Sequence, residues 1–246
     1  MNQLLNKLFR ISILLTGIFS YKNSVSQTLQ IGADYGRAYF LYKHKDYGTG
    51  FINENSLNKS SIARVTLSKS FGKNFFYETG IGFALYQQYY STRRFKGAYE
   101  SAYPIIHMPL LFGYNAEKRI SFKGSGGIIL GMMPDQYTGE YVVRYRPDNL
   151  PVDSITRGEA KRDFASFFPL ININAGLKYQ LTPAWAAELK GSFGKGFIKI
   201  TEYDIYYNNG SGSNDQRARQ WGTGDFYSVT LGVRYSLKNK SKPKSD

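Results

Sequence analysis

Residues able to do chemistry are few in this 246-residue sequence. Cysteine is absent, which excludes disulfides, thiolate metal sites, cysteine nucleophiles and a lipidated N-terminal cysteine. The only two histidines, His44 and His107, leave little room for a metal centre built from several imidazoles. No acidic cluster has the spacing of a calcium-binding loop. We therefore predict no metal site, no cofactor and no catalytic residue.

One catalytic alternative stays open, a hydrolase or transferase acting on acyl chains. Such an enzyme needs a nucleophile, a base and an orienting group. His44 and the neighbours Asp153 and Ser154 fall in two long polar connections and are the candidates. Neighbouring Asp and Ser are common, however, and no His-x-Ser strand motif is present. The Gly124–Gly127 stretch lacks the spacing of a dinucleotide-binding loop. We expect a protein that is not an enzyme.

The first 26 residues have the pattern of a signal peptide. Lys7 and Arg10 precede an apolar stretch at 11–19, and small residues follow at 24–26. The apolar stretch is nine residues long, whereas a membrane-spanning helix needs roughly 20. We predict that residues 1–26 are removed, which leaves 29 basic and 18 acidic residues, a net charge of +11.

Alternation of apolar and polar residues dominates the rest of the chain. In 226–237 the odd positions are all apolar or aromatic, and only Phe226 is apolar among the even ones. This period of two predicts a strand with one apolar and one polar face. Eight segments show it: 28–42, 60–71, 75–89, 103–114, 119–132, 168–181, 185–198 and 226–237.

The connections between these segments alternate in length. Short ones lie at 72–74, 115–118 and 182–184, and long ones at 43–59, 91–101, 134–165 and 199–224. Short turns at one rim and long loops at the other are typical of a transmembrane barrel. We predict an all-β fold, an eight-stranded antiparallel up-and-down transmembrane β-barrel over 27–237, with a basic periplasmic tail at 238–246.

The polar faces of the strands predict a filled lumen. An eight-stranded barrel is only wide enough inside for its own side chains. The predicted inward charges are Asp34, Glu78 and Glu188, with Arg64, Lys123, Lys178, Lys190 and Arg234. Opposite charges in such a confined interior should pair. A structural plug is therefore favoured over a conducting path, and inward glycines such as Gly80, Gly82, Gly176 and Gly232 leave room for the long basic side chains.

Aromatic residues gather near the predicted strand ends, which is typical of the two interfaces of a membrane barrel. Those expected at the short-turn rim are Phe71, Phe75, Tyr114, Phe122, Tyr179, Trp185 and Tyr235. Those expected at the loop rim are Tyr39, Tyr42, Tyr86, Tyr89 and Tyr90. An exported chain with this pattern is expected in the bacterial outer membrane.

Two stretches resemble the PorT-like outer-membrane β-barrel family. Residues 103–114 have a Pro-Leu-Leu core followed by Tyr, then a turn and the Gly-rich stretch 119–131. The segment Thr230–Leu237 resembles the C-terminal signal read by the barrel-assembly machinery, although it ends on Leu rather than an aromatic residue. The family often has an acidic residue where this chain has His107. The resemblance implies a barrel and a role in protein secretion or motility.

The basic charge is spread among tyrosines in an exported chain, so we expect contacts with outer-membrane lipids and no nucleic-acid partner. The connections 134–165 and 199–224 are rich in charge or in Tyr and Trp and are expected to be extracellular loops that bind a protein partner. The function we expect is non-enzymatic, structural or partner-binding, and an accessory role in protein secretion or envelope assembly is one form it could take. A narrow pore for small solutes, a lipid-modifying enzyme and a soluble ligand-binding barrel remain as alternatives.

Overall fold

The computed structural model describes residues 28–48, 58–71, 74–90, 99–116, 118–133, 140–145, 154–160, 167–207 and 216–237. The predicted signal peptide at 1–26 and the predicted tail at 238–246 lie outside these residues. No helix in the described part of the chain has the length and apolarity needed to cross a bilayer.

Eleven β-strands make up the described structure. They are β1 Leu29–Asp46, β2 Asn58–Phe71, β3 Phe75–Tyr90, β4 Tyr99–Asn115, β5 Ile120–Met132, β6 Glu140–Tyr145, β7 Ser154–Ala160, β8 Phe167–Gln180, β9 Trp185–Gly196, β10 Thr201–Tyr207 and β11 Gln216–Leu237. Eight of them, all except β6, β7 and β10, correspond to the eight predicted segments.

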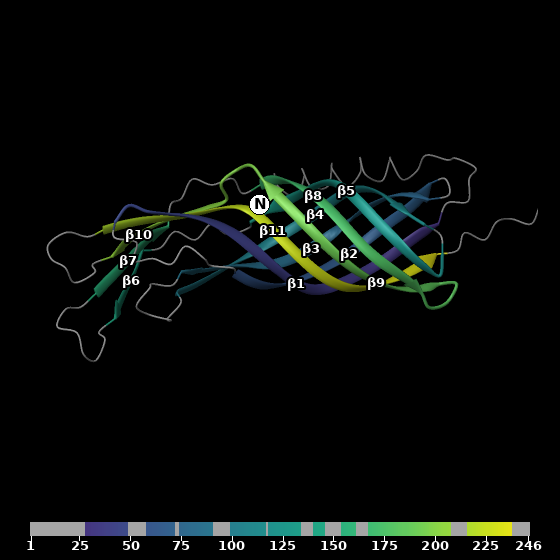
Figure 1. Cartoon of the computed structure of the whole chain (residues 1–246), viewed down its shortest axis with the longest axis horizontal. Coiled ribbons are helices and arrows are strands. Elements are labelled where there is room, and N and C mark those ends of the chain that lie inside the picture. Colours follow the sequence, from purple (N-terminus) through teal and green to yellow (C-terminus); the bar gives the residue numbers. More distant parts are fainter. Residues whose placement is uncertain are drawn as a thin grey trace, which may run out of the picture.

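These eight strands close into an antiparallel barrel (Figure 1). Each pairs with its neighbour in the order β1-β2-β3-β4-β5-β8-β9-β11, and β11 pairs back with β1 from Leu29 opposite Leu237 up to Asp46 opposite Ala218. A β-bulge between Phe40 and Tyr42 interrupts that last pairing. The prediction of an eight-stranded antiparallel barrel is confirmed.

The strand connections sort onto two rims as predicted. The short links between β2 and β3, β4 and β5, and β8 and β9 share one end with Leu29 and Leu237, at the right of Figure 1. The other connections that leave the barrel strands, including the four-residue link between β9 and β10, lie at the opposite end. In barrels of this kind the short turns face the periplasm, so the long connections face the outside.

Alternation along the strands separates a lipid-facing exterior from a packed interior. Outward side chains are large and apolar, with exposed fractions of 55% for Val65, 61% for Ile173 and 65% for Leu231. Inward residues between them are buried and mostly polar or small. An exposed apolar wall of this extent is stable only against hydrocarbon.

The aromatic prediction holds at the short-turn rim. There Phe75 lies 5.8 Å from Phe112 between ring centroids, and Trp185 lies 4.8 Å from Tyr235. At the loop rim the prediction was wrong for Tyr42 and Tyr86, which pack against each other inside the barrel at 5.0 Å. Both residues continue the inward alternation of their strands, Tyr42 after Phe40 on β1 and Tyr86 after Ala84 on β3. The side chains of Tyr89 and Tyr90 lie outside the described residues.

Three further strands extend the wall beyond the loop rim, at the left of Figure 1. The first part of β11, Gln216–Gly222, pairs with β1 on one side and β10 on the other, and β7 and β6 follow. We call these strands, β1-β11-β10-β7-β6, the outer sheet. The prediction of 134–165 and 199–224 as plain loops was wrong, because β6, β7, β10 and the start of β11 lie in them. These strands extend past the lipid-facing barrel, so their sequences lack its strict apolar alternation.

Candidate functional site

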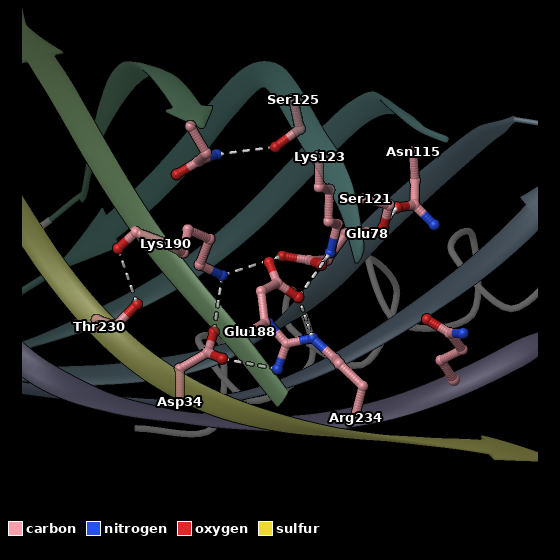
Figure 2. Close-up of polar contacts among 12 residues, drawn as sticks. Asp34, Glu78, Asn115, Ser121, Lys123, Ser125, Glu188, Lys190, Thr230 and Arg234 are labelled. Carbon is pink, nitrogen blue, oxygen red and sulfur yellow. Dashed lines mark hydrogen bonds and ion pairs between the residues drawn. The ribbon is translucent and has the colours of Figure 1, made fainter. Parts of the chain in front are cut away.

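The periplasmic half of the lumen contains a buried network of ion pairs (Figure 2). Its members come from five strands and point toward one another: Asp34, Glu78, Lys123, Glu188, Lys190 and Arg234. The carboxylate of Asp34 accepts from Lys190 Nζ at 2.7 Å and forms an ion pair with Arg234 Nη1 at 2.6 Å. Both cations are almost completely buried.

The two glutamates complete the network. Lys123 Nζ lies 2.9 Å from Glu78 Oε2 and 3.3 Å from Glu188 Oε2. Arg234 Nε lies 2.9 Å from Glu188 Oε2, and Lys190 Nζ lies 3.6 Å from Glu78 Oε1. Every cation of the network therefore has two carboxylate neighbours, which offsets the cost of burying its charge.

Some glycines make room for charged side chains, as predicted for Gly82 and Gly232, whereas Gly80 and Gly176 lie against the backbone of a neighbouring strand. A Cβ atom on Gly32 would collide with the guanidinium of Arg234, and one on Gly232 would collide with the carboxylate of Asp34. Gly82 lies in the same way against the side chain of Arg64. All eight predicted inward charges are buried. The predicted pairing is confirmed for the six residues of the network.

A second layer of buried polar groups lies next to the network. Arg64 Nε and Nη2 and both ring nitrogens of His107 have no hydrogen-bond partner among the described residues. The same is true of Asn172 Oδ1 and Asn174 Oδ1. Buried groups of this kind are normally satisfied by internal water. We call this level the polar layer.

The polar layer includes direct cross-strand neighbours. Asn174 lies opposite Ser192, and Ser192 lies opposite Ser228. The hydroxyls of Ser192 and Ser228 have no hydrogen-bond partner in the described structure. Asn174 Nδ2 donates to Ser125 Oγ at 3.0 Å. Small polar side chains of β5, β8, β9 and β11 therefore border the lumen here.

An apolar cap closes the lumen on the loop side. Its residues are Ala38, Phe40, Ile62, Ala84, Tyr86, Ile105, Ile129, Met133, Phe168, Leu170, Ile200 and Phe226. Phe40 meets Tyr86 edge to face at 4.7 Å. Phe226 stacks on His107 at 5.8 Å and carries the Arg64 guanidinium over its ring at 5.9 Å, so the cap directly covers the polar layer. Within the described residues, this level of the lumen is filled by apolar side chains.

The mouth at the other end is polar. A small pocket there is lined by Gln30, Ser68, Ser70, Asn74, Asn115, Lys123 and Lys178, with Phe75 and Phe76 beside them. Lys123 belongs both to this pocket and to the ion-pair network. Polar side chains thus line the periplasmic end of the lumen, and apolar side chains fill the other end.

The structure does not bring the candidate catalytic residues together. His44 lies in β1, where its Nε2 is 3.1 Å from Gln220 Nε2. Following the pairing from His44 through β11 and β10 leads to Ala160 of β7. Ser154 lies six residues from Ala160 at the other end of that strand, roughly 20 Å along an extended chain. Asp153 lies outside the described residues. Those residues also contain no group of three side chains suited to a metal ion.

Charged residues of β10 and β11 form a row of ion pairs on the outer sheet, which we call the charge ladder. It was not predicted from the sequence. Arg217 donates to Asp204 at 2.7 Å and Arg219 at 2.9 Å. These hydrogen bonds raise the pKa of both guanidinium groups above its ordinary value. Glu202 lies 3.1 Å from Arg219 and 2.7 Å from Lys199. Acids spaced by two in 202–204 and bases spaced by two in 217–219 were the available signal for paired strands.

A closed barrel with an apolar exterior and a polar packed lumen defines a class of protein. In hydrocarbon, only such closure pairs every backbone group of a sheet. The chain is an outer-membrane β-barrel protein of the bacterial cell envelope.

Solved structures of the same class resemble it at low identity. The outer membrane protein OprG from Pseudomonas aeruginosa has 12% identity and a TM-score of 0.46, over 87% of this chain and 98% of that one. A major outer membrane protein from Thermus thermophilus has 11% identity and a TM-score of 0.47, over 87% and 100%. The outer membrane protease OmpT from Escherichia coli has 9% identity and a TM-score of 0.38, over 89% and 99%. No protein-family model and no curated protein sequence matches the chain. Identities of this order say nothing about activity.

Proposed function

We propose that this protein is a non-enzymatic outer-membrane barrel that binds a protein partner through its outer sheet. The partner would belong to a protein-secretion or envelope-assembly system. The observation that carries the proposal is the combination of a capped lumen with a sheet that continues three strands beyond the barrel wall. These two features support an ordered surface outside the membrane rather than a passage through it.

The outer sheet is suited to present a binding edge. The sheet order ends at β6, and the hydrogen-bonded neighbour of β6 in the described structure is β7. A strand at a sheet edge offers backbone N–H and C=O groups to an added strand of another chain. The charge ladder between β10 and β11 ties this edge to the barrel. Rigid presentation lowers the entropy lost on binding.

The resemblance of 103–114 and 119–131 to PorT-like proteins supports the secretion role. In this chain those stretches form β4 and β5 of the barrel wall, apart from the outer sheet. The PorT-like assignment is therefore part of the proposal, and the partner-binding region is argued from the outer sheet alone.

Site-specific photo-crosslinking in intact cells tests the proposal. We expect a photoreactive residue at Val142 in β6 to give a discrete protein adduct. We expect the adduct to be lost when a second, distant change, Asp204→Asn, weakens the link of β10 to β11. A photoreactive residue at Lys118, in a periplasmic turn, is the matched control and should not give the same adduct. If the photoreactive residue at Val142 gives no protein adduct, the proposal is contradicted.

The narrow pore is the second candidate, and the unpartnered groups of the polar layer favour it. It requires ions to pass the apolar cap. In planar bilayers we expect no steady conductance from the purified barrel. Conductance steps in the wild-type protein would replace our proposal with the pore. For the lipid-modifying enzyme, the corresponding test is acyl release that disappears in Ser154→Ala.

A further inference from the structure

The lipid-facing side of β1 and β2 becomes basic at the outer limit of the apolar wall. Outward positions of β1 run from Tyr35, which is 62% exposed, to Arg37 and Tyr39. On β2 the exposed Lys59 lies opposite Tyr39, and Ser61 lies opposite Arg37. Arg37 and Lys59 are therefore diagonal neighbours on adjacent strands.

Hydroxyl groups converge on the same place. Arg37 Nη1 and Tyr35 Oη each donate to Ser61 Oγ at 3.4 Å. Tyr39 stacks on Tyr227 at 4.8 Å, and stacked tyrosines are typical of the membrane interface. The group thus combines two cations and two hydroxyls at the boundary between hydrocarbon and headgroups.

This surface has no acid of its own. The outward-facing positions of β1 and β2 in their described lengths include no Asp or Glu. The first part of β11 differs, because its arginines are paired with Asp204 and Glu202 of β10. Farther along the outward side of β1, Lys43 and Lys45 add two more exposed cations. Arg37 and Lys59 therefore have no acidic neighbour on β1 or β2.

The depth of Arg37 restricts the anions that it can bind. Across the other edge of β1, Arg37 lies opposite Val229, which is 54% exposed on the lipid-facing wall. A cation facing the hydrocarbon edge is costly unless it reaches an anionic group at the interface. Anions present at that depth are the phosphate groups of lipids.

We propose that Arg37 and Lys59, with the hydroxyls of Tyr35 and Ser61, bind a phosphate group of an outer-leaflet lipid. The long connections face outside, so this level of the barrel meets the outer leaflet. Arg37 provides N–H groups in the planar arrangement that suits phosphate, and Lys59 adds a compact positive charge. The stacked pair Tyr39 and Tyr227 then lies beside the first sugar or glycerol of the lipid.

Native mass spectrometry of the purified barrel in detergent tests this site. The probes are lipid A with two phosphates, phosphatidylcholine as a lipid without net charge, and inorganic phosphate as a competitor. The test variant is R37Q/K59Q. The control variant is K118Q/R119Q, which removes one Lys and one Arg from the exposed periplasmic rim. Heat-dependent mobility confirms that each variant forms the barrel.

We expect the affinity of R37Q/K59Q for lipid A to fall roughly 30-fold, because each of the two lost basic groups contributes a factor of about five to six. The lipid A affinity of the control variant should fall by less than about threefold, because this variant loses the same net charge but keeps Arg37 and Lys59. Equal losses in both variants would show unspecific charge attraction and overturn the site. Unchanged lipid A affinity in R37Q/K59Q would also overturn it, and so would displacement of lipid A by millimolar inorganic phosphate, which would identify a free-phosphate site. The outcome is independent of the crosslinking from β6.

Discussion

Neutralising Asp34 should destabilise the barrel strongly, although the change removes only one charge. In Asp34→Asn the side chain keeps its size but no longer balances Lys190 and Arg234. Removing one member of a buried pair typically costs about 3–5 kcal/mol. Here Arg234 keeps Glu188 at 2.9 Å and Lys190 keeps Glu78 at 3.6 Å. We therefore expect a loss near the lower end, about 3 kcal/mol of unfolding free energy.

Urea unfolding in lipid vesicles measures this loss, followed by the fluorescence of Trp185 and Trp221. Trp185 lies on the outward side of the barrel near the periplasmic rim, and Trp221 lies on the outer sheet. The control is Lys199→Gln, which removes the half-exposed pair with Glu202. Pairs of this kind contribute about 0–1 kcal/mol, so the control should unfold close to the wild type.

A double variant distinguishes electrostatics from packing. Asp34→Asn with Lys190→Met removes one charge of each sign and leaves Arg234 with Glu188. Replacing a buried pair by groups of similar volume is often close to neutral, so the double variant should regain about 2 kcal/mol over Asp34→Asn. If the loss in the double variant equals the sum of the losses in Asp34→Asn and Lys190→Met, the two residues do not balance each other's charge, and the reasoning is refuted.

Four further expectations concern the other layers. Arg64→Met should change the unfolding free energy by less than about 1 kcal/mol, because it replaces a buried cation that has no ion pair in the described structure. Arg234→Met should cost about 3 kcal/mol or more in the same urea assay, because it leaves Asp34 and Glu188 without this partner. Gly232→Val should cost about 1–3 kcal/mol by overpacking against Asp34, measured by the same unfolding curves. Phe226→Ala should cost about 3–5 kcal/mol and produce conductance steps in planar bilayers, since it opens the apolar cap. Asp204→Asn should make the outer sheet sensitive to protease while the heat-dependent mobility of the barrel stays unchanged.

The barrel could be predicted because lipid imposes a simple rule on its strands. Each residue of 226–237 faces either hydrocarbon or lumen. The hydrocarbon-facing positions are therefore all apolar or aromatic, and Phe226 is the one apolar residue on the lumen side. The inward charges followed from the same alternation. The outer sheet could not be found in this way. In 216–222, Arg217 and Arg219 alternate with Ala218 and Gln220, and neither set is an apolar face.

Two features of the lumen depend on geometry that alternation does not contain. Between the pairs Phe40–Phe226 and Tyr42–Gly222, β11 has two more residues than β1, so that 224–226 are buried in succession, and such a bulge leaves no clear sign in the sequence. Arg64 lies directly opposite Asp34 on the neighbouring strand, yet in the described structure the carboxylate of Asp34 pairs with Lys190 and Arg234. Alternation assigns a residue to a face but does not choose its partner.

The ion-pair network also bears on the order of folding. Asp34 is in the first strand, its partner Lys190 is 156 residues away, and Arg234 is in the last strand. Contacts between the two ends of a chain form late, because every intervening loop must close first. Until β11 pairs with β1, the guanidinium of Arg234 is missing between Asp34 and Glu188. Arrival of the last strand thus completes the hydrogen-bonded ring and neutralises the interior in one event, which makes partly inserted barrels unstable and the final closure cooperative.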